Sequence, residues 1–567
     1  MRPGQEAAAN GRRLRALYSR EWAWRLGQVV RRIGGRNPLH ARLPDVDPSA
    51  QAARTGVWAA ALRELDEIAG GPLSAEDRED LAVFRQQVEV LHEGQLFRDY
   101  ERPFTCFASF WDDPAALLRE QTLRTEADFR TAIAMLRDIP RFFAGNIAQM
   151  RAGLAAGNRQ PAVVVERCLP TIRAVARAAP EDTGFMAAFA IMPQSIPSRV
   201  QDALRGEARD VIADSVIPAH VDLLRFMEAE YLPAAGPVRP ATLHPTGAGY
   251  YAAKVREYTT LDITPEEVRA IGAAEVRSVA AEMDRAMRET GFAGTMEQFL
   301  AHLREAPEFY ARSEDELLMR AAWITKQVEG RIDRFFGRLP RRRFAITPVP
   351  KALASTYPPG TGSLRAYHLN TNDLRAQPLY LLPVLTLHEA IPGHCFQMAL
   401  AAENKSRPAF RADSYGVAYG NAWALYCEKR LGIEMGIYRT AHERFGMWSF
   451  IGLRAARMVV DVGLHLDGWS RDRACAYLRR HTALSEHVVN TEVDRYISWP
   501  GQALGYYLGM LSIERMRARA EDALGPDFDL RAFHDTIMEI GSVPMKVLET
   551  RLERFIAEGG RGPYPLD

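Results

Sequence analysis

The sequence predicts a mostly α-helical protein, formed by one large helical body with a central cleft and a small β element beside a candidate metal motif. Three observations support this expectation. Across most of the 567 residues, apolar side chains recur every three or four positions, which is the period of a helix. Several of these segments open on residues that cap helices. The sequence also lacks the marks of a parallel sheet, which are a glycine-rich phosphate loop after a strand or a Gly-x-Ser-x-Gly turn.

The composition is that of a folded protein without a strong field of either sign. Hydrophobic residues make up 47% and charged residues 25%, which excludes a disordered chain or a disulfide-stapled miniprotein. The 72 basic and 71 acidic residues give a formal net charge of +1. We therefore expect no nucleic-acid partner and no anionic membrane surface. The longest apolar stretch, near Pro378–Leu387, is too short to span a bilayer. The composition leaves the oligomeric state open.

The cysteines and the first residues favour a cytoplasmic location. The chain has five cysteines, an odd count, and no pair has the spacing of a metal ribbon, so we interpret them as reduced thiols. The first residues contain no continuous apolar run of the kind found in secretory signal peptides. We therefore expect a cytoplasmic protein.

The domain organisation follows from where the helical pattern begins and breaks. We expect residues 1–40 to form a partly helical extension and residues 41–567 to form a single helical domain. The segment Leu232–Tyr251 is rich in proline and glycine, and it predicts a soft boundary near residue 240.

Three helices are signalled at their ends or along one face. Thr264–Glu267 offers an N-cap, a proline at the first helical position and a capping-box glutamate, and Gly291 supplies the stop. Ser313–Glu316 opens a second helix in the same way. Apolar residues on one face of Val547–Ile556 predict a third helix near the end of the chain.

A second interruption, at Leu339–Leu364, predicts the β element. It is rich in proline and glycine. We expect strands at Arg343–Val349 and Arg365–Leu369, which together form a small sheet or hairpin beside the helices.

The most informative segment is a histidine motif at His388–His394. Zinc-peptidase helices carry two histidines four residues apart, with a glutamate between them as general base. Here Glu389 follows His388 directly, but the second histidine, His394, comes six residues after the first. Six residues turn a regular helix by about 600°, so the two rings would point apart. The spacing works only if the helix breaks, and Pro392 and Gly393 favour such a break.

A zinc site with two histidines needs a third ligand, often a glutamate from a following helix. The next strong helical segment is 418–428, which carries Asn421 and Glu428. Seven residues make two helical turns, so both side chains share a face and either is a candidate ligand. A solvated charge beside its basic neighbours would explain Glu428 equally well.

The motif region resembles the domain of unknown function 885 (DUF885) family, which is related to the gluzincin metallopeptidases. The family pattern His-Glu-Ala-x-Pro-Gly-His matches His388–His394. A second family block, Glu-Gly-Trp-Ala-Leu-Tyr-x-Glu, resembles residues 421–428, and a third, Arg-Tyr-x-x-x-Pro-Gly-Gln-Ala-x-x-Tyr, resembles residues 495–506. The resemblance runs from about residue 40 to the end. It implies a large, mostly helical fold and one Zn²⁺ per chain.

The second block departs from the family at Asn421, where the family has the glutamate that is its expected third zinc ligand. Asparagine is neutral and a poorer zinc ligand than a carboxylate. Three outcomes stay open. Asn421 binds weakly through its carbonyl oxygen, Glu428 takes its place, or the metal is absent or different. The departure leaves Glu389 untouched as the expected general base.

The resemblance also implies residues that act on the substrate. A hydrogen-bond donor must stabilise the oxyanion of the tetrahedral intermediate. Tyr506, Tyr496, Arg495 and His487 are candidates, and we favour Tyr506 because it matches the tyrosine that ends the third block. Arg495 and Tyr496 are expected substrate-binding residues, with Arg495 placed to clamp a carboxylate.

A further family block covers the residues before the motif and implies an edge strand over the cleft. Such an edge could hold an extended peptide by backbone pairing, with Arg365 and Asn370 as substrate contacts. An ordinary loop and hairpin explains these two residues equally well.

Taken together, the sequence predicts a zinc-dependent hydrolase of peptide or amide bonds in small peptides or amino-acid conjugates. One alternative is a family member repurposed for a non-proteolytic step of specialised metabolism, which the altered residue Asn421 would fit. Another is an inactive helical binding protein, against which the retention of His388, Glu389 and His394 argues.

Overall fold

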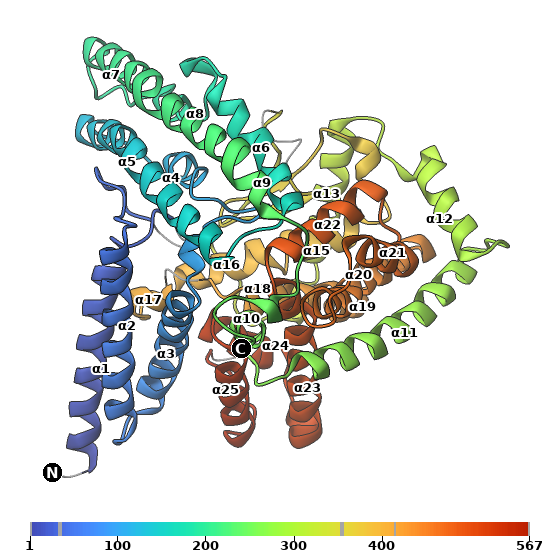
Figure 1. Ribbon diagram of the computed structural model, residues 1–567. Helices are drawn as coiled ribbons and strands as arrows, with labels where there is room; N and C mark the ends of the chain where they lie inside the picture. Colours follow the sequence, from blue (N-terminus) through green and yellow to red (C-terminus); the bar gives the residue numbers. More distant parts are fainter. Residues whose placement is uncertain (1–2, 32–36, 352–356, 413–414, 565–567) are drawn as a thin grey trace. The chain divides into compact units, whose positions relative to one another are not determined.

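The computed structural model describes residues 3–31, 37–351, 357–412 and 415–564, and these residues form two compact units (Figure 1). The first unit contains Met1–Ala253 and Thr491–Trp499, and the second contains Lys254–Asn490 and Pro500–Asp567. Helices dominate both units and strands are few, so the expectation of a mostly α protein with a small β element is confirmed. The boundary near residue 240 stays a prediction, because units defined by compactness need not fold separately.

Helices make up most of the first unit. Its helices are α1 (Pro3–Arg25), α2 (Pro48–Ala69), α3 (Ala75–Leu96), α4 (Asp113–Glu120), α5 (Glu126–Ala156), α6 (Ala162–Ala176), α7 (Ser198–Val211), α8 (Ile217–Phe226), α9 (Leu232–Ala235), the start of α10 (Gly249–Thr259) and the end of α22 (Glu486–Ser498). Helix α5 shows why the chain is helical here: Thr125 and Asp128 form a capping box at its start, and Gly157 ends it with a positive φ of 78°.

The core of the first unit is aromatic. Phe110 packs edge to face against Trp111 and Phe143, with ring centroids 5.1 and 5.3 Å apart. The break expected at Leu232–Tyr251 is shorter than predicted, because α9 continues to Ala235 and α10 begins at Gly249. Pro233 directly follows a π-helical turn, Met227–Tyr231, through which the helix continues from α8 into α9.

The second unit holds the remaining elements. They are α11 (Pro265–Glu289), α12 (Met296–Glu305), α13 (Glu314–Glu329), β1 (Ala345–Pro348), β2 (Gly360–Gly362), β3 (Ala366–Leu369), α15 (Leu382–Glu389), α16 (His394–Glu403), α17 (Ala409–Ala412), α18 (Val417–Tyr426), α19 (Gly432–Glu434), α20 (Ala441–His465), α21 (Arg471–His481), α23 (Gly505–Leu524), α24 (Leu530–Ile540) and α25 (Met545–Ala557). The three helices predicted from caps and periodicity are confirmed as α11, α13 and α25, and the capping box of α11 forms as expected.

In the second unit, helix α11 packs along helix α20 (Figure 1). Their approach depends on Gly272 of α11, where a Cβ atom would come 2.8 Å from the Cβ of Met458. A second close pair is α18 with α23, where a Cβ on Gly509 would come 2.5 Å from the Cβ of Ala422. Small residues therefore let four of the longer elements lie almost backbone to backbone.

The β element is a three-stranded sheet in the order β1-β3-β2. Strand β1 pairs with β3 in parallel, with Ala345 opposite Ala366, and β2 pairs with β3 antiparallel, with Gly360 opposite Leu369. The two predicted strands correspond to β1 and β3. The residues of β2, Gly-Thr-Gly, have little intrinsic preference for a strand, so only the family resemblance implied an edge strand in this region.

Candidate functional site

The two motif histidines lie at the facing ends of two helices. Helix α15 ends at Glu389, and α16 begins at His394. Between them the chain folds back on the end of α15. A Cβ atom on Gly393 would lie 2.0 Å from the carbonyl oxygen of His388, so only glycine fits there. The break predicted from Pro392 and Gly393 is confirmed. Because of it, the two imidazole rings need not point apart as they would in a continuous helix.

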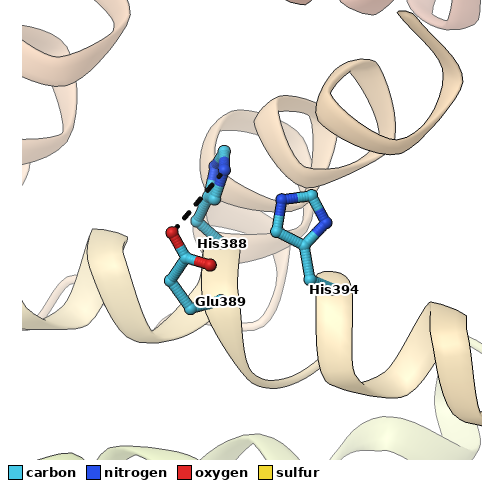
Figure 2. Close-up of side chains that lie close together, drawn as sticks. All are labelled: His388, Glu389 and His394. Atoms are coloured by element: carbon cyan, nitrogen blue, oxygen red, sulfur yellow. Dashed lines mark ion pairs between the residues drawn. The ribbon is translucent and has the colours of Figure 1, made fainter. Parts of the chain in front are cut away.

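His388, Glu389 and His394 converge as a result (Figure 2). One ligand atom from each residue lies within 4.8 Å of the others. The imidazole centroids are 4.8 Å apart and their planes are perpendicular. Nε2 of His388 is 4.0 Å from Oε1 of Glu389. Among the described residues, this is the group of histidine, cysteine and acidic side chains with the spacing of a metal site.

Glu428 contacts His388 on the side of the ring away from Glu389. Nδ1 of His388 lies 2.5 Å from Oε1 of Glu428, a carboxylate with no solvent exposure. Arg454 of α20 donates to the same oxygen at 3.2 Å. Glu428 belongs to a π-helical turn, Cys427–Leu431, and Tyr438 donates its hydroxyl hydrogen to the Glu428 carbonyl at 2.6 Å. Glu428 therefore bonds to Nδ1 of His388, and the other ring nitrogen, Nε2, is left to face Glu389.

His394 has two neighbours of its own. Its Nδ1 lies 3.3 Å from the hydroxyl of Tyr415. The side chain of Asn421, on α18, lies near His394 and partly offsets the lowering of its pKa by burial. The amide nitrogen of Asn421 donates to the carbonyl of Val417 at 3.0 Å. The structure thus brings Asn421 to the second histidine and Glu428 to the first.

Glu389 is fixed by the edge strand. The backbone N–H of Gly362 in β2 donates to Oε2 of Glu389 at 2.6 Å. Strand β2 passes so close that a Cβ on Gly362 would lie 2.1 Å from the Glu389 carbonyl oxygen and 2.8 Å from the Cβ of His394. The small sheet therefore orients the carboxylate of the motif.

Burial controls the ionisation of the cluster. It lowers the pKa of His388 well below the usual value, with the charges of Arg454 and Arg457 adding to the effect, and it lowers the pKa of His394 to about 3. Both rings are therefore neutral, which is the state that offers a lone pair. Burial also raises the pKa of Glu389 to about 8 and that of Glu428 to about 7. A cation beside these groups would offset the cost of burying the carboxylates.

Tyr506 lies in the same unit, at the start of α23. The guanidinium of Arg457 stands 5.2 Å from the centre of its ring. Burial raises the pKa of Tyr415, and the phenol of Tyr506 adds to the rise. The block that contains Tyr506 is anchored through Gly501, whose N–H donates to the buried carboxylate of Asp461 at 3.1 Å.

The expected substrate-binding residues come from both units. Arg495 and Tyr496 belong to the part of α22 in the first unit, where Tyr496 donates to Glu492 at 2.6 Å. Arg365 is exposed at the turn between β2 and β3. The amide of Asn370 donates to the Tyr357 carbonyl at 3.0 Å and so ties the hairpin together. Their roles toward a substrate stay predictions.

Tyr415, Gly362 and Arg454 were not predicted as residues of the site. Arg454 had a signal, because arginine is unusual inside an apolar helix and it recurs three residues later at Arg457. Tyr415 and Gly362 had none, since each depends on contacts between elements far apart in the chain.

Comparison with known proteins places this fold in a bacterial group. A family model described as "Bacterial protein of unknown function (DUF885)" matches residues 21–552. A solved structure from Colwellia psychrerythraea superposes with a TM-score of 0.86 at 24% identity and covers 98% of this chain and 99% of its own. One from Shewanella oneidensis superposes with a TM-score of 0.71 at 16% identity and covers 95% and 98%. No curated protein matches the sequence significantly.

These neighbours contradict the expected cytoplasmic location. Both solved structures are described as a "putative lipoprotein". A lipoprotein is held at a membrane by an attached lipid rather than by a spanning helix. The cytoplasmic expectation rested on the five cysteines and on the first residues. No helix in the described parts of the chain is both long and apolar enough to cross a bilayer.

Proposed function

The chain belongs to the DUF885 family, and on that premise we propose that it is a metal-dependent hydrolase of amide bonds. The observation that carries the proposal is the convergence of His388, Glu389 and His394 in one buried cluster. Two imidazoles and an adjacent carboxylate, placed on both sides of a helix break, are the groups that a zinc hydrolase requires.

The donors present fit a divalent cation of the zinc type. Both imidazoles are neutral, and each has a neighbour at Nδ1, Glu428 for His388 and Tyr415 for His394. This leaves Nε2 of both rings to bind the ion. Asn421 would offer its carbonyl oxygen as a third, neutral ligand. A bound zinc ion supplies a Lewis acid that polarises the amide carbonyl and lowers the pKa of a water molecule.

The side chains of this protein perform the proton transfers. Oε2 of Glu389 is held by the Gly362 N–H, so Oε1, which faces His388, takes the proton from the attacking water. Glu389 then gives this proton to the leaving amine. Tyr506 is the candidate donor to the oxyanion of the tetrahedral intermediate, because it matches the tyrosine that ends the third family block.

The burial of the cluster favours a small substrate. The side chains of His388 and Glu389 are 6% and 12% exposed. A compact amide, such as a small peptide or an amino-acid conjugate, reaches such a site more easily than a loop of a folded protein. We therefore propose this class of substrate.

Asn421 favours a second candidate function, a non-proteolytic reaction on the same scaffold. A site with two neutral histidines and a neutral amide leaves more positive charge on the ion than the family's glutamate would. Such an ion binds anionic ligands more strongly, and this would suit a family member that has left peptide hydrolysis.

The first experiment measures bound metal in the intact protein, purified without added metal or chelator, by elemental analysis. We expect about one zinc per chain, lost in His388→Ala and retained in His92→Ala, a control histidine on α3 of the first unit. The absence of bound metal, even after zinc is added back, would refute the proposal.

A second experiment separates the two candidate functions. The zinc-loaded protein and Asn421→Glu are assayed on small peptides and acyl amino acids. Increased hydrolysis by the variant indicates a peptidase weakened by Asn421. Loss of a native activity in the variant, without any gain of hydrolysis, favours the repurposed enzyme.

A further inference from the structure

Tyr415 lies beside His394 and comes from a segment that no recognised motif covers. It precedes α18 by two residues, with Gly416 between. Its hydroxyl oxygen is 3.3 Å from Nδ1 of His394, and the two rings stand 6.2 Å apart at an angle of 69°. The backbone that follows it is anchored, because the N–H of Gly416 donates to the hydroxyl of Ser542 at 2.5 Å.

Gly420 makes room for this phenol. A Cβ atom at position 420 would lie 1.9 Å from the Tyr415 hydroxyl oxygen, 2.3 Å from Cζ and 2.7 Å from Cε2. The ring therefore lies directly on the backbone of α18, in a place that any larger residue would fill. The adjacent residue on that helix, Asn421, lies near the same histidine. A glycine in the interior of a helix costs stability relative to alanine, which is explained here by the tyrosine it accommodates.

The two histidines of the cluster are thus held in parallel ways. His388 has Glu428 at Nδ1, and His394 has Tyr415 at Nδ1. A partner at one ring nitrogen fixes which nitrogen carries the hydrogen and how the ring is turned. Of the two partners, only Glu428 lies in a family block.

We propose that Tyr415 is a positioning residue for His394. Its hydroxyl oxygen accepts the Nδ1–H hydrogen bond, which keeps Nε2 deprotonated and directed toward His388 and Glu389. The inference rests on the proposed metal-dependent function. It adds a residue outside the family motifs, and it assigns Gly420 the role of seating that residue.

Zinc affinity, measured by competition with a chromogenic chelator, tests the inference. Tyr415→Phe keeps the ring and removes the hydroxyl, and we expect it to bind zinc roughly tenfold more weakly, the lower end of the effect of losing such a partner. Gly420→Ala pushes the phenol away and should weaken zinc binding to a similar degree. Both changes remove the same hydrogen bond. The double variant should therefore bind zinc no more weakly than the single variant with the lower zinc affinity.

Tyr419→Phe is the matched control. Tyr419 is a buried tyrosine four residues along, and its hydroxyl donates to the carbonyl of Ile537 at 2.6 Å, away from the cluster. We expect it to unfold at a lower temperature but to bind zinc as the unaltered protein does. Equal zinc affinity for Tyr415→Phe and the unaltered protein would overturn the inference.

A second readout does not depend on metal. Long-range ¹H–¹⁵N spectra of the metal-free protein, labelled at histidine, report which nitrogen of His394 carries the hydrogen. We expect the Nδ1–H form in the unaltered protein and a mixture of both forms in Tyr415→Phe. An unchanged pattern would refute the role of Tyr415 even if zinc binding, and with it the proposed function, had already failed.

Discussion

The contact between β2 and the motif makes Gly362→Ala the most informative single change in this protein. The added Cβ would lie 2.1 Å from the Glu389 carbonyl oxygen and 2.8 Å from the Cβ of His394. The first of these atoms is backbone at the end of a buried helix, so no side-chain rotation relieves the clash. The separation must widen from 2.1 Å to at least 3.0 Å.

A displacement of that size breaks the hydrogen bond that orients the carboxylate. The Gly362 N–H to Glu389 Oε2 distance is 2.6 Å, and it would lengthen beyond the useful range. Because burial raises the pKa of Glu389 to about 8, its carboxyl is mostly neutral at pH 7. A hydrogen bond between neutral groups contributes about 0.5–1.5 kcal/mol, and overpacking a tight site costs about 1–3 kcal/mol. We therefore expect Gly362→Ala to lower the free energy of unfolding by roughly 2–4 kcal/mol.

The assay is urea denaturation followed by circular dichroism, with Gly360→Ala as the matched control. Gly360 lies in the same strand, but a Cβ there would meet only side-chain atoms, the nearest being Cε2 of Tyr367 at 3.0 Å. These atoms can move, so we expect a loss of at most about 1 kcal/mol. Equal urea midpoints for the two variants would refute the reasoning, because the backbone contact would then carry no more weight than a side-chain contact.

Three further predictions concern burial and capping. Burial lowers the pKa of His220 to about 4. The contribution of the neutral buried ring to stability is therefore complete above pH 6.5 and is lost as the pH falls toward 4. Between pH 7.5 and 5, the free energy of unfolding measured with urea should fall by about 2 kcal/mol more in the unaltered protein than in His220→Gln. An equal fall in both proteins would contradict this. Thr264→Ala should lower stability by about 1 kcal/mol while Thr264→Ser retains it, because the hydroxyl caps α11. Trp423→Phe should lower the thermal midpoint by the equivalent of about 2 kcal/mol, since its Nε1–H donates to the buried Pro392 carbonyl at 2.8 Å, and an unchanged midpoint would count against that bond.

Local signals in the sequence predicted the helices and the break in the motif. Thr264 and Ser313 act as caps through hydrogen bonds that span three residues, so the sequence alone reveals them. The break at Pro392 and Gly393 is equally local. Strand β2 has no local signal, because its pairing with β3, rather than its own residues, makes it a strand.

The partners of the histidines depended on contacts between distant elements. The seven-residue spacing predicted that Asn421 and Glu428 share a face of the helix. It did not show that they meet different rings, or that the π-helical turn presents Glu428 to Nδ1 of His388. Tyr415 reaches its position through Gly420, and no periodicity in the sequence encodes that pairing.

The first unit is built from two stretches of chain that are far apart in sequence, and this limits how the protein can be divided. Thr491–Trp499 belongs to it together with Met1–Ala253. Within it, Gln160 donates to the Ser498 carbonyl at 3.1 Å, and the N–H of Cys106 donates to the Ser498 hydroxyl at 3.3 Å. A fragment ending at Ala253 would leave both donors without these acceptors. Restoring it would require the segment to be supplied as a separate peptide, so fragment complementation is the natural way to obtain this half alone.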